Sequence, residues 1–179
     1  ILKNIGNRVG CRRFFSTCFF WTTKRLSRTS LWPKQKKIDY QVRYLALAAS
    51  SGALDRVYCG PLICSRDGLI DDGSRDYPEV DHSTFYGKVQ GGLADFTLTP
   101  SFYSLAYASN RLPGSFCTAA VNSVAGLHHF SLVGSDDRIY HLCWCRDGQA
   151  ISLEDLYTPE QLAVAKITDA CGQPVERPL

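Results

Sequence analysis

The chain contains 179 residues, of which 45% are hydrophobic and 21% charged, which is enough apolar material for a sizeable core and excludes a globally disordered chain. The net charge of +3 is unevenly distributed, because residues 1–38 contain ten lysines and arginines and no acid, whereas the remainder carries 10 basic and 17 acidic residues. The body is therefore acidic, near −7, and a basic nucleic-acid-binding face on it is not indicated.

The first 38 residues form a basic segment rich in aromatic residues and serine, "RRFFSTCFFW" followed by "KRLSRTSLWPKQKK". This composition is typical of a mitochondrial transit peptide. Two alternatives stay open: a basic tail or arm that lies on a partner, and a secretory signal, although polar residues interrupt the apolar run 14–21. The segment favours a mitochondrial location if it is native, and otherwise a cytoplasmic or secreted one. No stretch approaches the roughly 20 apolar residues of a membrane span.

The segment from residue 39 onward is rich in short β-prone runs. "VRYLALAAS" (42–50) and "LDRVYC" (54–59) flank Ser51-Gly52, and "LHHFSLV" (127–133) and "RIYHLCW" (138–144) flank a Gly-Ser-Asp-Asp turn. Both pairs predict β-hairpins. Residues 65–92 are rich in glycine and acids, which predicts a long turn-rich excursion with one strand near 84–89.

One segment departs from the β pattern. In "YTPEQLAVAKITDACGQP", Thr158 stands three residues before Gln161, the spacing of a capping box, and Pro159 fills the first helical position. The Gly-Gln-Pro sequence that follows is a stop signal. These features predict a helix over 159–170.

Two stretches of the chain resemble each other. "LADFTLTP" (93–100) is echoed by "LEDLYTP" (153–159), and "LAAS" precedes "LDRVYC" as "TAAVNS" precedes "LHHFSL". The separation suits an internal repeat, with coincidence as the alternative.

The run ending in "HLCWC" is the most obvious place to look for a metal site. In a strand, His141, Cys143 and Cys145 share one face, and the opposite face is apolar. Neighbouring ligands on that face lie about 7 Å apart, too far to share one tetrahedral ion at bonds of about 2.0 to 2.3 Å. His128 or His129 on the partner strand would be the nearest further donors. We expect no metal at this place, and a hydrogen-bonded histidine beside free thiols.

Eight cysteines leave their redox state open. Free thiols are the main expectation, and a disulfide or half of a metal site at Cys59 and Cys64 is the alternative.

Motifs for catalysis are missing from the sequence. The Gly-x-Ser-x-Gly elbow is absent, and so is a glycine-rich phosphate loop. The carboxylate pairs Asp71–Asp72 and Glu79–Asp81 are typical of an exposed acidic loop. We therefore expect no catalytic residue, no cofactor and no enzymatic activity.

Four residues have the chemical types that bind a sugar. Aromatic faces stack on the apolar side of a pyranose, and charged groups hydrogen-bond its hydroxyls. The candidate ligand-binding residues are Arg56, Asp72, His141 and Trp144.

The stretches "LPGSFCTAAVNS" and "HHFSLVGSDDRIYHLCW", followed by Asp-Gly, resemble a blade of the fungal fucose-specific lectin β-propellers. "LALAASSGALDRVYC" with its following Asp-Gly is similar to an earlier blade, so the resemblance covers roughly residues 44–156. In that family an arginine, an acid and aromatic residues hold the sugar between blades. The resemblance assigns the arginine to Arg56 and an aromatic to Trp144, whereas His129 and His141 replace the arginine and the glutamate of the later blade.

These observations together predict a mainly β protein with antiparallel hairpins, two or three propeller-like blades over 39–179, one C-terminal helix and a basic arm over 1–38. The resemblance implies a non-enzymatic, lectin-like module for a fucose-like sugar or glycan. The alternative is a structural accessory subunit of a large mitochondrial complex, respiratory or ribosomal, which would contact other subunits through residues 1–38. A closed propeller needs four to eight blades, so either several protomers assemble to complete a ring, or the chain is a fragment, or the fold is a different one. Assembly with other chains is the main expectation.

Overall fold

The computed structural model describes residues 2–19, 21, 28, 31–63, 68–73, 92–121, 126–146 and 149–176. More of this part of the chain is helical (34%) than extended (25%), so a mixed α and β fold replaces the expected mainly β one. The expected antiparallel strands are present. The helices are α1 (Leu2–Arg8), α3 (Pro33–Ser51), α4 (Pro100–Ser109) and α5 (Pro159–Val164), with 3₁₀ turns η1 (Leu93–Asp95) and η2 (Leu153–Asp155). The strands are β1 (Phe15–Phe19), β2 (Arg56–Cys59), β3 (Ile70–Asp71), β4 (Thr97–Leu98), β5 (Phe116–Val121), β6 (Leu127–Val133) and β7 (Ile139–Cys145).

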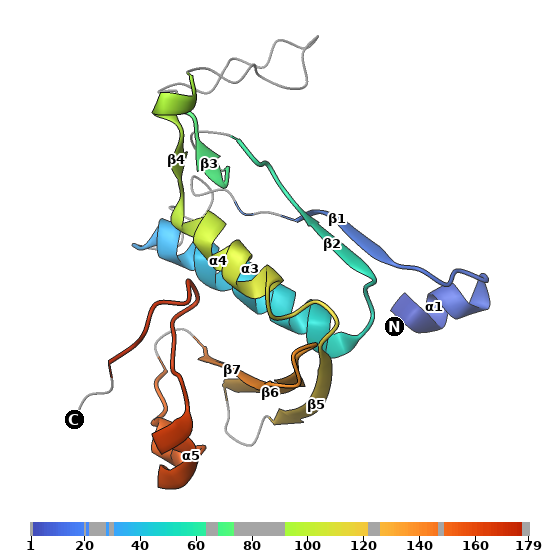
Figure 1. Cartoon of the computed structure of the whole chain (residues 1–179). Helices are drawn as coiled ribbons and strands as arrows, with labels where there is room; N and C mark the ends of the chain where they lie inside the picture. Colours follow the sequence, from blue (N-terminus) through green and yellow to red (C-terminus); the bar gives the residue numbers. More distant parts are fainter. Residues whose placement is uncertain are drawn as a thin grey trace.

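Helices α3 and α4 lie side by side at the centre of the fold (Figure 1). Small side chains at their contact, including the fully buried Ala46 and Ser104, allow the two backbones to approach closely. The Gln41 side-chain amide on α3 donates to the Ser101 carbonyl at 3.0 Å and to the Ser104 hydroxyl at 3.4 Å. This buried polar contact fixes the two helices relative to each other.

The strand expected over 42–50 is wrong, because these residues form the second half of α3. The helix starts with Pro33 in its first turn and ends at Gly52, whose left-handed backbone (φ 54°) lets its N–H bond to the Ala49 carbonyl. The leucines and alanines of the run are also strong helix formers. The first expected hairpin is therefore absent, although "RVYC" is indeed strand β2.

The described strands form three separate sheets, and none of them closes into a barrel or propeller. Strands β1 and β2 pair in parallel, β3 and β4 pair antiparallel, and β5, β6 and β7 form an antiparallel meander. The meander packs on α3 through β5 and β6. The strand expected near 84–89 lies outside the described residues.

The predicted β6–β7 hairpin is confirmed. Leu127 pairs with Cys145 and the register continues without interruption to Val133 and Ile139. The turn closes through a hydrogen bond from the Gly134 N–H to the Arg138 carbonyl, and Asp137 adopts the left-handed conformation that aspartate tolerates in such turns.

The N-terminal segment contributes to the body of the fold. Strand β1 pairs with β2, and the Phe14 N–H donates to the Asp55 carboxylate at 2.7 Å. The boundary expected at residue 38 falls inside α3. The part that extends beyond the paired strand is residues 2–13, which we call the N-terminal arm (Figure 1).

The C-terminal segment begins as predicted and ends earlier. Thr158 and Gln161 form the capping box, but α5 stops at Val164 because Ala165 adopts an extended backbone. The chain then turns at Gly172, where the ring of Tyr107 on α4 leaves no room for a Cβ atom. The Tyr107 and Thr168 hydroxyls lie 2.7 Å apart, which holds this segment on α4.

The echoed sequences also share local structure. Both 93–95 and 153–155 form a 3₁₀ turn, and each is followed by a Thr-Pro pair that opens a helix. The other half of the expected repeat fails, since "LAAS" lies in α3 whereas "TAAV" lies in β5.

Candidate functional site

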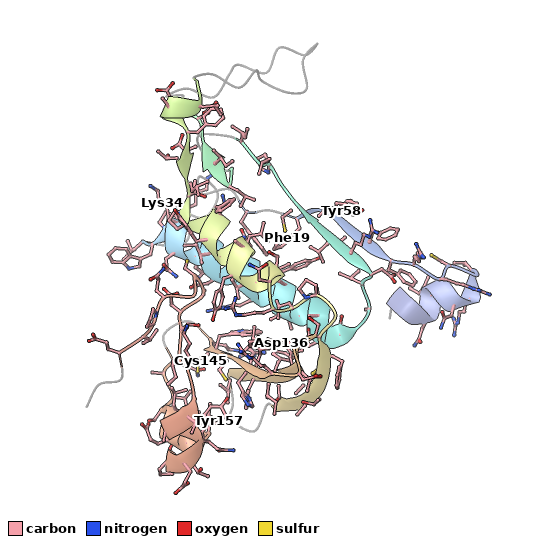
Figure 2. The ribbon with its side chains drawn as sticks, viewed as in Figure 1. Phe19, Lys34, Tyr58, Asp136, Cys145 and Tyr157 are labelled. Atoms are coloured by element: carbon pink, nitrogen blue, oxygen red, sulfur yellow. The ribbon has the colours of Figure 1, made fainter. Side chains whose placement is uncertain are left out.

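A group of polar side chains gathers on the face of the β6–β7 hairpin that points away from α3. His129 on β6 lies directly opposite Cys143 on β7, and Ser131 lies opposite His141. Because side chains alternate along a strand, His129, His141 and Cys143 all project from this one face. Tyr157, from the segment between η2 and α5, covers it. Figure 2 shows Tyr157 on the C-terminal segment and Cys145 at the end of β7.

The four side chains form a hydrogen-bonded group that we call the histidine cluster: His129, His141, Cys143 and Tyr157. The Nε2 atom of His129 lies 3.1 Å from Nδ1 of His141 and 2.9 Å from the hydroxyl oxygen of Tyr157. The Cys143 Sγ atom lies 3.4 Å from the same hydroxyl. The three rings pack closely, with the Tyr157 centroid 5.1 Å from that of His141.

The number of protons in this cluster is limited by its geometry. A ring nitrogen offers either one hydrogen or one lone pair, and the Nε2 atom of His129 has two close neighbours. When Nε2 is unprotonated, it accepts a hydrogen bond from Tyr157 or from His141. When it is protonated, it donates to an unprotonated Nδ1 of His141, and the Tyr157 hydroxyl is free to donate to Cys143. Two protonated nitrogens at 3.1 Å would repel, so at least one of them carries a lone pair.

The surroundings keep the cluster uncharged. Burial lowers the pKa of His129, and the neighbouring His141 lowers it further. Burial also lowers the pKa of His141. For Cys143, burial raises the pKa and outweighs the opposing hydrogen bond with Tyr157. Burial likewise raises the pKa of the Tyr157 hydroxyl, so the shifts of all four groups favour their uncharged forms.

The opposite face of the hairpin is an aromatic layer toward α3. The indole of Trp144 stacks with the ring of His128 at 5.2 Å and with that of Phe130 at 5.3 Å. The Arg43 guanidinium of α3 lies 6.0 Å from the indole centroid. The predicted apolar face of β7 therefore faces helix α3.

The four residues predicted to bind a sugar are spread over three sheets. Arg56 starts β2 and is exposed, and Asp72 follows β3 and is buried. His141 and Trp144 both lie on β7, but they are three positions apart and project from opposite faces. Of this set, only His141 belongs to the histidine cluster.

Metal-binding groups of the usual kind are not found in the described ranges: no three His, Cys, Asp or Glu side chains there are arranged to hold an ion. The six cysteines whose side chains the structure describes are free, among them Cys59, Cys143 and Cys145. Cys64, the expected partner of Cys59, lies outside the described residues.

The sequence indicated most of the cluster but not Tyr157. The alternation of β7 placed His141 and Cys143 on one face, and the sequence named His128 or His129 on the partner strand as the next donor without deciding between them; the register of the hairpin selects His129. Tyr157 lies twelve residues beyond the end of β7 and reaches the face only because η2 turns the chain back. The nearest available signal was its place immediately before the Thr-Pro helix start.

The fold and the cluster define a mixed α and β protein in which a helix pair separates a parallel strand pair from an antiparallel three-stranded sheet. Comparison with known protein families, curated proteins and solved structures finds no match for this chain. In the part of the chain that the structure describes, no helix is both long and apolar enough to cross a membrane.

Proposed function

We propose that the chain is a non-enzymatic accessory subunit that binds a larger assembly through its N-terminal arm. The observation that carries this proposal is the position of the arm: α1 lies at the far end of β1, away from the paired helices α3 and α4 (Figure 1). A helix of seven residues is marginal in water by itself, because so few hydrogen bonds offset the cost of nucleation. Contact with a partner would supply the missing stabilisation.

The surface of the arm combines cations with apolar side chains. Arg8, Arg12 and Arg13 are exposed, and so are Ile5 and Val9, the latter to 75%. Arginine and exposed aliphatic groups together are suited to a protein interface, where the guanidinium pairs with carboxylates around an apolar contact. The arm contains no acid, so a partner with a negatively charged surface fits it best.

The arm is joined to the body by a specific contact. Gly6 of α1 is buried against the ring of Phe14, and a Cβ atom at Gly6 would lie 1.9 Å from that ring. The Phe14 N–H is in turn bonded to Asp55. The arm is therefore anchored to the body where it leaves β1. A partner can then recognise where the arm lies as well as its charge.

In this proposal the N-terminal region is a retained arm and not a cleaved transit peptide, and its partner is a mitochondrial complex, respiratory or ribosomal. The experiment compares sedimentation of the full chain with that of a variant carrying Arg8→Gln, Arg12→Gln and Arg13→Gln. We expect the unaltered chain to sediment with a mitochondrial complex and the variant to remain at the size of the free chain. A matched variant that neutralises three exposed body arginines, Arg56, Arg138 and Arg146, should sediment normally.

Equal sedimentation of the arm variant and the unaltered chain would contradict the proposal. Carbohydrate binding stays a prediction from the sequence resemblance. Its test is retention on a fucose column that Arg56→Ala weakens, and an absence of retention across a glycan array would rule it out.

A further inference from the structure

We propose that the histidine cluster is a binding site for a divalent transition-metal ion of the copper and nickel class. The ligands are Nε2 of His129 and Nδ1 of His141, and the hydroxyl oxygen of Tyr157 is the third donor. This site is independent of the N-terminal arm and of the accessory-subunit proposal.

Two of the three separations between the donor atoms, both measured from Nε2 of His129, are short enough for one shared ion. Two nitrogens bound at about 2.0 to 2.1 Å lie about 2.9 Å apart at a right angle and about 3.4 Å apart at the tetrahedral angle. The two imidazole nitrogens are 3.1 Å apart, and Nε2 of His129 is 2.9 Å from the Tyr157 oxygen. Both values lie near the right-angle separation, and a tetragonal arrangement of nitrogen and oxygen donors is typical of Cu²⁺ and Ni²⁺.

The protonation of the two rings also suits a metal. When a hydrogen bond joins the two rings, one of the two facing nitrogens carries the hydrogen. With an ion bound, both facing nitrogens supply lone pairs, so each ring keeps its hydrogen on its other nitrogen: Nδ1 of His129 and Nε2 of His141. No net proton leaves the imidazoles, because only the tautomer changes. Neutral imidazoles are the form in which histidine binds metals.

The site is held in place and open on one side. His129 lies on the central strand of the sheet and is 8% exposed, so its ring is fixed by packing. His141 lies on the edge strand β7 and is exposed, which gives an ion a path from solvent. Preorganised donors lose little conformational entropy on binding.

The proposed donor set differs from a usual metal site, which has at least three His, Cys, Asp or Glu ligands. Only two of the three donors are His, Cys, Asp or Glu, since the third is a phenol oxygen. The Cys143 thiol is hydrogen-bonded to the Tyr157 hydroxyl. The same spacing argument that excludes an ion shared along β7 does not apply, because the donors come from β6, β7 and the segment after η2.

The test titrates NiCl₂ into the full, untagged chain by calorimetry, after chelator treatment and with a phosphine reductant that keeps the thiols reduced. Nickel is the probe because Cu²⁺ would oxidise free cysteines. We expect one ion per chain, and at least a tenfold weaker affinity in His141→Ala. His141 is exposed, so this variant should fold, and His129→Gln is the second variant.

The matched control is His128→Ala, which removes an imidazole from the opposite face of the same hairpin. It should bind nickel with the affinity of the unaltered chain. Tyr157→Phe should weaken binding by a smaller factor than either histidine variant, and an unchanged affinity there would remove the phenol from the donor set. The site is ruled out if nickel does not bind, if His141→Ala and His129→Gln bind as tightly as the unaltered chain, or if His128→Ala loses as much affinity as they do.

Discussion

The ring of Phe19 in β1 lies almost parallel to the ring of Tyr44 in α3, with centroids 3.8 Å apart and planes inclined by 15°. The Tyr44 hydroxyl also donates to the Ser16 hydroxyl at 2.5 Å. These contacts join the N-terminal strand to the central helix. Residues 15–19 are thus part of the folded body, and the arm that is free to meet a partner begins N-terminal to them.

Replacing Phe19 should destabilise the whole fold. Phe19 is 9% exposed and its ring also contacts Trp21. Phe19→Ala should lower the free energy of unfolding by about 3 kcal/mol, because a buried aromatic ring is lost from between β1 and α3. Urea denaturation followed by circular dichroism measures this change.

The control for that experiment is Phe15→Ala in the same strand. Phe15 is 48% exposed, so its loss should cost less than about 1 kcal/mol. Similar destabilisation by the two variants would mean that β1 is not docked through Phe19.

The contact between α3 and α4 depends on Gln41. Gln41→Ala removes two buried hydrogen bonds and leaves a small cavity, so it should lower the free energy of unfolding by about 1 to 3 kcal/mol. Gln35→Ala on the same helix removes only an exposed bond to Asp39 and should cost less than about 0.5 kcal/mol. An equal effect of the two variants in chemical denaturation would contradict this role of Gln41.

The residues buried at this contact show why the sequence did not predict α3 and α4. The buried residues of α3 are Lys37, Ile38, Gln41 and Ala46, and those of α4 are Ser101, Ser104 and Ala108. Their spacing is helical, but most of them are polar or small, so a search for apolar residues at 3.6-residue intervals misses them. The β6–β7 hairpin was predictable because its strands combine β-prone residues with a turn sequence.

The capping box of α5 gives a local test. Thr158 accepts from the Gln161 N–H, and the Gln161 side chain accepts from the Thr158 N–H. Thr158→Ala should destabilise α5 by about 1 kcal/mol and speed hydrogen exchange of its amides. Thr158→Ser keeps the hydroxyl and should restore protection; a failure to do so would mean that the cap does not hold this helix.

Acid should loosen the β6–β7 turn at a pH that Tyr140 determines. The hydrogen bond from Tyr140, at 2.8 Å, is the main cause that lowers the pKa of Asp136 below its ordinary value of 3.8. A lowered pKa stabilises the fold above the unfolded-state pKa of about 3.9 and loses that contribution as the pH falls through the folded-state pKa. Carbon-13 NMR of the Asp136 carboxyl should show a titration midpoint below 3.8.

Tyr140→Phe removes the main cause of this shift, so the midpoint should move toward 3.8. A midpoint that stays unchanged in Tyr140→Phe would contradict the assignment. Because Asp136 is exposed, overall stability should change little.

The alternation of side chains along a strand predicts only part of the candidate site. The sequence placed His141 and Cys143 on one face and correctly separated them from Trp144. The contact between His129 and His141 is a diagonal one, and it depends on the register of the hairpin, which the turn sets. Tyr157 depends on the path of a connecting segment, and no local pattern encodes such a path.

The most direct measurement of the proposed role is site-specific photo-crosslinking in intact mitochondria. A photoreactive residue at Val9 in the arm is compared with one at Val164 at the end of α5, because both positions are strongly exposed, to 75% and 88%. The account predicts that Val9 crosslinks to one subunit of a large complex, and that the product disappears when Arg8, Arg12 and Arg13 are changed to glutamine. A product from Val164 alone, or a Val9 product that persists without the three arginines, would contradict it.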